Sequence, residues 1–555
     1  QTGTGLTGRP PPPRGTGPLP LPRQMGEPIR VREAGCLQAV AEETRVLLFI
    51  AVPSLVRLAL VQMADRMTIA FVGAYDPTPE HIAGCVLGKM FSNITGVSVG
   101  IGLSIGVTTF ASQNHGRGTS RRNGFVLRQC RRVFAGAWAF SLLAALFSRQ
   151  LLHTLGQPEE VLLPCQLFSL IAAIGLPAMW MSSAIQCVII SQGNAMPSMV
   201  CDGMASLTNL ALAYALLRGG FGFLGLAWAT TTSYCMSLLF SMMYVVYTGR
   251  QATVWEVPKE EEGEGEVNLG LFVRTSLPSA LCMWIEWWAA EVMAVIAGWL
   301  PGGEYSVGGH GLLFNTAAIF YMAFVANSIA ANTRIGNLVG AKEAKRIQIC
   351  IATGMAWVVA LSAVISCFLL FYGPALLRLY TKEPGILAEA DGANPGMVMT
   401  IAPYSLMMFF LGVLRGGNLQ MWGAAAMFAS FYFFGIPMSA YLGLRGNYGL
   451  LGVWLGNAMG MGLSAAMISV KLYCVDWSKQ IVRANLEGGA SPAGDGLEER
   501  LLLAQAEGAA TRCQCLARRL QLGTCWKRAE ASAPPTWVAA EMAAHWASVD
   551  DTMPA

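Results

Sequence analysis

Long apolar stretches recur from about residue 46 to about residue 474, and short polar stretches separate them. An α-helix rises 1.5 Å per residue, so about 20 apolar residues are needed to cross the roughly 30 Å hydrocarbon core of a bilayer. These stretches are too long and too continuously apolar for barrel strands. The pattern therefore predicts an all-α polytopic membrane protein with twelve transmembrane helices. The predicted spans are residues 46–72, 83–112, 133–154, 163–191, 197–217, 222–248, 271–299, 306–332, 348–377, 396–414, 421–443 and 449–474.

An internal repeat divides these spans into two sets of six. Residues 104–122 align without gaps with residues 328–346, and three shorter matches follow the same order at nearly the same offset. Six spans return the chain to its starting side, so the halves share one orientation and are related by a pseudo-twofold axis along the membrane normal. The predicted lobes are an N-lobe, residues 46–248, and a C-lobe, residues 271–474.

The remaining segments are polar. Residues 1–45 are rich in proline and glycine and predict a disordered arm, and residues 249–270 read as an acidic linker. The tail, residues 475–555, contains a stretch from Asp495 to Gly523 that predicts an amphipathic helix.

Basic residues in the short connections predict the orientation. Six arginines lie in the connection after the second span and four lysines or arginines in the connection after the eighth, whereas AYDPTPEH and PGGEYSVGGH contain none. By the positive-inside rule, the even-numbered connections, both termini, the arm, the linker and the tail are cytoplasmic. With 54% hydrophobic and 13% charged residues and a net charge of +4, the composition favours a lipid bilayer and excludes a nucleic-acid partner.

Two acids interrupt the apolar segment LCMWIEWWAAEVMAVIAGWL. A carboxylate in the middle of a membrane costs at least about 2.5–3.5 kcal/mol, so Glu286 and Glu291 are functional candidates, with a structural role as the alternative. Their five-residue spacing is roughly 140° around a helix, which predicts that only one points straight at a cavity axis. Protons and cations can compete for such a carboxylate, and Trp287 offers a π face to an organic cation or anchors the helix at the interface.

Polar residues elsewhere in the spans add candidates. In LVQMADRMTIAFVG, Asp65 and Gln62 are candidates for the same site, and for Asp65 and Arg66 an internal ion pair that holds the bundle together is the alternative. Asn315 in the eighth span could bind a substrate or bridge helices, and the same choice applies to Asn327 and Asn332.

Several motifs resemble the eukaryotic branch of the multidrug and toxic compound extrusion (MATE) family over roughly residues 48–484. The motifs are Asn93 to Ser98, Ser112-Gln113, Gln192-Gly193, Pro278 to Leu281, the EWW segment with Glu291, Arg334-Ile335-Gly336-Asn337 with Gly340-Ala341, Gly412 to Gly416, Gly435 to Pro437 and Asp476-Trp477. The resemblance implies proton-coupled export of organic cations and amphipathic compounds through a cleft between the lobes, with Glu286 binding proton and substrate. This chain departs from the family in having Thr108, Asn315 and Tyr404 where members often have acids. These three residues, together with Asn93 of the first motif, are candidates for the same proton- and substrate-binding site.

Other functions stay open on the same scaffold. They are a lipid flippase, a single-metabolite exporter and a sodium-coupled antiporter. Among the five histidines no spacing matches a metal site, so we expect neither an enzyme nor a metal or other cofactor. We expect a monomer in the plasma or vacuolar membrane.

Overall fold

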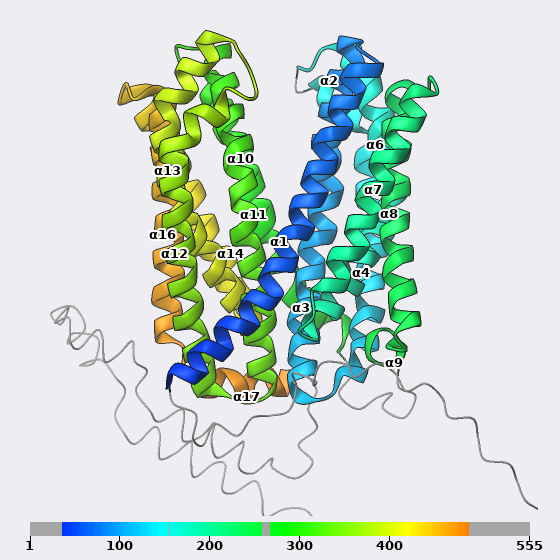
Figure 1. Ribbon diagram of the computed structural model, residues 1–555, viewed down its shortest axis with the longest axis vertical. Helices are drawn as coiled ribbons and strands as arrows, with labels where there is room; N and C mark the ends of the chain where they lie inside the picture. The colour runs from blue at the N-terminus through cyan, green and yellow to red at the C-terminus, as the bar shows by residue number, and fades with distance from the viewer. Residues whose placement is uncertain (1–35, 155, 258–266, 488–555) are drawn as a thin grey trace, which may run out of the picture.

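The computed structural model describes residues 36–154, 156–257 and 267–487, and within these ranges the chain is helical and contains no strand. The helices form two upright bundles that are joined at the end of the molecule carrying α17, called here the α17 end (Figure 1). The helices and helical turns are α1 (Cys36–Tyr75), α2 (Pro79–Ser92), η1 (Asn93–Val97), α3 (Ser98–Arg117), η2 (Ser120–Arg122), α4 (Asn123–Leu146), α5 (Ser148–Thr154), α6 (Glu159–Ser191), α7 (Met196–Arg218), α8 (Gly222–Tyr247), α9 (Gln251–Val254), α10 (Leu269–Gly298), α11 (Glu304–Gly340), α12 (Ala344–Leu377), α13 (Pro384–Gly416), α14 (Gln420–Ser430), η4 (Phe431–Gly435), α15 (Ile436–Ala440), η5 (Tyr441–Arg445), α16 (Gly449–Cys474) and α17 (Trp477–Glu487).

The predicted membrane-spanning class is confirmed. Eleven helical segments in the described ranges are long and apolar enough to cross a bilayer. The bent pair formed by α4 with its preceding turn and α5, with an angle of 58°, makes the twelfth. The second and eleventh spans each contain π-helical turns, so α2, η1 and α3 form one span and α14 to η5 form another.

The first helix begins earlier than predicted. Residues 36–45 were expected to belong to a disordered arm, but α1 starts at Cys36. The apolar pattern misses these first turns because they contain Glu42 and Glu43, whose charges are compensated by arginines about 290–305 residues later in the chain.

The predicted linker and tail also contain helices. The short helix α9 occupies residues 251–254 of the linker, and α17 follows the last span. The predicted amphipathic helix at Asp495 to Gly523 lies outside the described residues.

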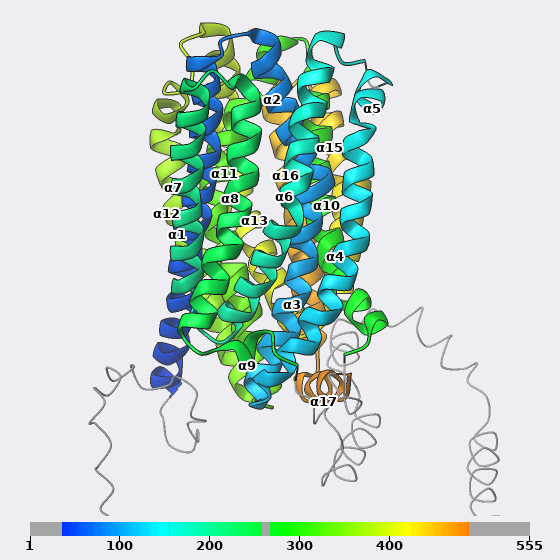
Figure 2. The same cartoon turned by 90° about the vertical axis from the view of Figure 1, so that its right-hand side faces the viewer.

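Each lobe has its own apolar core, and one helix of each lobe begins in the core of the other. Leu47 and Ile50 of α1 belong to the core of the C-lobe. Phe272 and Ala280 of α10 belong to the core of the N-lobe, where the Phe272 ring stacks on Phe110 with centroids 6.1 Å apart. Figure 1 shows α1 crossing from the foot of α12 to the opposite bundle, and Figure 2 shows the packed helices after a quarter turn. The first and seventh spans, which the repeat pairs, therefore both cross the lobe interface.

Helix α3 packs closely against the C-lobe, toward the α17 end. A Cβ on Gly340 would lie 2.2 Å from the carbonyl oxygen of Gln113, and one on Gly102 would lie 2.5 Å from the Cα of Ala280. Only glycine permits this approach of the backbones. The interface between the lobes is therefore closed in this half of the molecule.

Candidate functional site

A cavity of about 400 Å³ lies between the two lobes. One wall comes from α1, α2 and η1 of the N-lobe, and the other from α10, α11, α13, η4 and α16 of the C-lobe. Glu286 on this wall is 17 residues after Leu269, roughly 26 Å along α10, so the cavity lies well away from the closed α17 end. A cavity at a lobe interface is a common position for a small-molecule site.

The Glu286 carboxylate is held in place by an aromatic pair. Its Oε1 accepts a hydrogen bond from the hydroxyl of Tyr404 at 2.8 Å. The Tyr404 ring stacks on Tyr321, with centroids 3.9 Å apart, and the Tyr321 hydroxyl is hydrogen-bonded to Thr400. Since Tyr321 and Tyr404 both line the cavity, the carboxylate is fixed at its surface.

The second acid of α10 also lines the cavity. Glu291 is half-buried, and within the described part of the chain its carboxylate has no hydrogen bond or ion pair. The five-residue spacing predicted that only one acid would face the cavity axis. Both Glu286 and Glu291 are among the residues that line the cavity. The C-lobe wall thus presents one fixed carboxylate and one without a protein partner.

The N-lobe wall carries an ion pair of Asp65 with a partner that the sequence did not predict. Asp65 pairs with Lys89 of α2 at 2.9 Å and not with its neighbour Arg66. Consecutive residues point in directions about 100° apart on a helix, which keeps the two side chains of α1 separate. Arg66 Nη1 instead donates to Oδ1 of Asn315 at 3.0 Å, across the interface between the lobes.

The other candidates divide between the cavity and the helix packing. Gln62, Asn93 and Trp287 line the cavity, as Asp65, Asn315 and Tyr404 do. Thr108 does not line it, because it lies on α3 beyond the closed contact, where its carbonyl oxygen accepts from Ser191. Asn327 is also absent from the lining, and its side chain donates to the carbonyl oxygen of Ala323 within α11.

Two titratable residues of the cavity lining were missed. Lys89 is the lone basic residue inside the predicted span 83–112, and the rule that singled out the membrane acids would have found it. His310 lies in the second turn of α11 and lines the cavity. Among the described residues, no group of three or more His, Cys, Asp or Glu has the geometry to hold a metal ion.

The closed α17 end contains a buried ion cluster between α1 and the C-lobe, called here the Glu43 cluster. Glu43 accepts from Arg334 Nε and Nη2 at 2.8 and 2.7 Å and from Arg346 Nε at 2.7 Å. Arg346 also pairs with Glu42 at 2.8 Å. This cluster fixes the first turns of α1 to α11 and α12.

Three of the motifs that carry the family resemblance, those containing Gln113, Gly336 and Gly416, meet at this closed interface. Gln113 donates to the carbonyl oxygen of Gly416 at 3.2 Å, and Thr109 donates to that of Arg415 at 3.1 Å. A Cβ on Gly336 would collide with the side chain of Ser112. These motif residues therefore close the lobes against each other and do not line the cavity.

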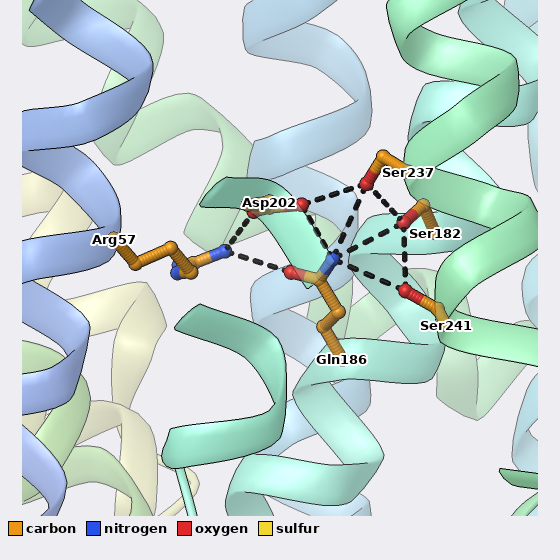
Figure 3. A network of polar contacts seen from close by, with 6 residues as sticks. All are labelled: Arg57, Ser182, Gln186, Asp202, Ser237 and Ser241. Atoms are coloured by element: carbon orange, nitrogen blue, oxygen red, sulfur yellow. Dashed lines mark hydrogen bonds and ion pairs between the residues drawn. The ribbon is translucent and has the colours of Figure 1, made fainter. Parts of the chain in front are cut away.

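A second buried network ties α1 to the N-lobe (Figure 3). The guanidinium of Arg57 contacts Asp202 at 3.2 Å and the side-chain oxygen of Gln186 at 3.0 Å. Three serines complete the network by hydrogen bonds to Asp202, to Gln186 or to one another. They are Ser182 of α6 and Ser237 and Ser241 of α8. Helix α1 is thus bound to the C-lobe at its start and to the N-lobe 14 residues later.

Comparisons with known proteins agree with this geometry. A family model described as MatE matches the chain twice, at residues 53–215 and 278–441, which are the two halves of the internal repeat. The chain is 25% identical over 449 residues to Protein DETOXIFICATION 49 of Arabidopsis thaliana, covering 81% of this chain and 89% of that protein. It is 25% identical over 452 residues to Multidrug and toxin extrusion protein 1 of Danio rerio, covering 80% and 74%.

Solved structures show the same fold. The crystal structure of the eukaryotic MATE transporter AtDTX14 matches with a TM-score of 0.74 and 21% identity, over 81% of this chain and all of that one. The bent form of the Vibrio cholerae MATE transporter VcmN matches with a TM-score of 0.68 and 18% identity, over 81% and 99%.

Proposed function

The chain belongs to the MATE family of multidrug and toxin extrusion transporters, which are membrane-embedded and handle small molecules, and from this premise we propose that it is a proton-coupled antiporter. It exports organic cations or amphipathic compounds in exchange for protons by alternating access. Members of this family are transporters and not enzymes, so the chemistry required of the site is binding and release.

The observation that carries this proposal is the fixed carboxylate of Glu286 at the surface of the cavity between the lobes. A carboxylate that water and substrate can reach binds either a proton or a cation, and exchange of one for the other is antiport. Glu291 supplies a second negative charge in the same cavity, and the aromatic rings of Trp287 and Tyr321 suit a hydrophobic cation.

The asymmetry of the interface supports an outward-facing state. The lobes are closed toward the α17 end, where the Arg-rich turn η2 and the Glu43 cluster lie, and the cavity lies in the other half. The positive-inside rule assigns the α17 end to the cytoplasm. Both termini then lie in the cytoplasm, and the cavity faces the outside of the cell or the vacuolar lumen.

Proton coupling is favoured over sodium coupling by the ligands of the acid. Within the described residues, the only protein group hydrogen-bonded to the Glu286 carboxylate is the hydroxyl of Tyr404. A sodium ion would need several oxygen ligands around one acid. A flippase or a single-metabolite exporter would use the same cavity. These alternatives differ from the present proposal in the compound that is transported.

The test is uptake of a radiolabelled organic cation, tetraethylammonium, into proteoliposomes with an imposed pH gradient. Wild type should accumulate the cation, and Glu286→Gln should lower the initial rate at least about tenfold, because the neutral amide neither titrates nor balances the cationic charge. Glu304→Gln is the matched control, since it removes the same charge at an exposed position at the start of α11, outside the cavity.

Equal rates for wild type and Glu286→Gln would exclude Glu286 as the coupling group. Uptake driven by a sodium gradient but not by a pH gradient would show that the coupling ion is sodium and not the proton. Uptake under neither gradient would refute export of organic cations.

A further inference from the structure

The two walls of the cavity differ in charge. On the N-lobe wall, Asp65 and Lys89 neutralise each other at 2.9 Å, which leaves the guanidinium of Arg66 as the uncompensated charge. On the C-lobe wall, Glu286 and Glu291 are both acidic and no carboxylate-cation pair involves either of them in the described residues. A cavity used only for cations would have no need of a cation on its wall, so Arg66 requires an explanation.

Arg66 is held in position without being neutralised. Its Nη1 donates to Oδ1 of Asn315, and the amide nitrogen of Asn315 donates to the carbonyl oxygen of Gly311 at 2.9 Å, which fixes the direction of that amide. A guanidinium has five N–H donors. Within the described chain, no carboxylate lies within 4.0 Å of it, and its nitrogens are not buried away from the cavity. Arg66 is therefore oriented by a neutral partner and retains donors for an anionic group.

A charged arginine inside a membrane protein is expensive, and it is retained where it has a partner or a ligand. Guanidinium and carboxylate groups match in shape and form two parallel charge-assisted hydrogen bonds. The aromatic side chains of the lining lie on the opposite wall, on α10, α11, α13, η4 and α16. A ligand in the cavity would thus meet acids and rings from the C-lobe and a guanidinium from the N-lobe.

We propose that Arg66 recognises an anionic group on the transported compound, so that the preferred substrates are amphoteric molecules with an ammonium and a carboxylate or sulfonate. This inference rests on the proposed function and narrows its substrate class. The cationic end lies against Glu286 and Glu291, and the anionic end against Arg66.

The competing interpretation is that Arg66 only connects the lobes through Asn315. That role predicts that a loss of Arg66 weakens the binding of all ligands alike. Recognition of an anion predicts a loss confined to ligands with an anionic group. A pair of ligands that differ only in that group separates the two roles.

The experiment measures binding of tritiated benzyldimethylammonio-hexanoate, a zwitterion, and of its methyl ester, a cation, to the purified full-length chain by scintillation proximity. In wild type, the zwitterion should bind at least as tightly as the ester. Arg66→Gln should raise the Kd of the zwitterion at least about tenfold and that of the ester less than about twofold. Arg66→Lys should restore part of the affinity. Arg45→Gln, which removes the same charge from an exposed position on α1, should change neither Kd.

Equal losses for both ligands in Arg66→Gln, an unchanged ratio of the two Kd values, or wild type that binds the ester but not the zwitterion would overturn the inference. Wild type that binds neither ligand would also overturn it. Because binding needs no ion gradient, failure of proton-driven uptake with the expected Kd pattern would refute the proposed function and leave the role of Arg66 supported.

Discussion

The Glu43 cluster should decide how readily the α17 end opens. Glu43 is fully buried, with 0% of its side chain exposed, and accepts three hydrogen bonds from two arginines. Removing one partner of a buried ion pair costs about 3–5 kcal/mol, because the remaining charges stay buried without compensation. If alternating access separates the start of α1 from α11 and α12, Glu43→Gln removes this energy from the present state alone. At the lower limit, about 3 kcal/mol, the ratio of closed to open forms falls roughly a hundredfold.

The measurement is the rate at which a water-soluble maleimide labels a cysteine placed at Thr109, quantified at that site by mass spectrometry. Thr109 has 1% exposure at the closed interface, so labelling requires the lobes to part there. Glu42→Gln is the matched control. Its side chain is 38% exposed, and loss of its ion pair should change the free-energy difference between the closed and open forms by less than about 1 kcal/mol.

The reasoning fails if Glu43→Gln labels no faster than Glu42→Gln. If Glu43→Gln labels no faster but melts at a lower temperature than wild type, the cluster stabilises the closed and open states equally and has only a structural role. If neither labelling nor melting changes, the neutral glutamine satisfies both arginines and the estimated cost is wrong.

Two further predictions concern a hydrogen bond in the cavity and a connection outside the membrane. Tyr404→Phe should slow proton-driven uptake about tenfold, because Glu286 loses a charge-assisted bond worth about 1.5–3 kcal/mol; an unchanged initial rate would show that the bond does not position the carboxylate. Burial acts to raise the pKa of Asp76, but hydrogen bonds from His81, Thr78 and the amide of Phe223 outweigh it and lower the pKa. The folded value is therefore below the unfolded value, and the stabilisation is present above about pH 4 and lost as the pH falls through the folded value. Asp76→Asn should lower the melting temperature at pH 7 by about 1–3 °C. The difference from wild type should shrink in acid, and a difference that grows in acid would contradict this account.

Hydropathy was sufficient to predict the spans, the two lobes and the acids of α10, because each depends on local pattern or on repetition along the chain. It could not place the start of α1, since the charges of Glu42 and Glu43 are compensated by Arg334 and Arg346, far away in sequence. A charge in a helix looks unfavourable until its partner is known.

The candidate site was predicted in part for a similar reason. Eight candidates, from Gln62 to Tyr404, line one cavity, and their roles remain predictions. Thr108 does not line the cavity. Whether a residue faces a cavity depends on the position of the neighbouring helices, which the sequence does not show. The partner of Asp65 was also missed, because adjacent charges in sequence suggested Arg66 while the helix directs it toward Lys89.

The crossing of α1 between the lobes has a consequence for biosynthesis. Glu43 and Arg346 are separated by 303 residues. At about 5–20 residues per second, roughly 15–60 s pass between synthesis of the acid and synthesis of its second arginine. During that time the first turns of α1 lack the helices against which they pack, and an uncompensated carboxylate remains at the membrane surface. These first turns of α1 thus reach their final position only after α12 has been made, and a chain that stops after the N-lobe leaves Glu43 without its arginines.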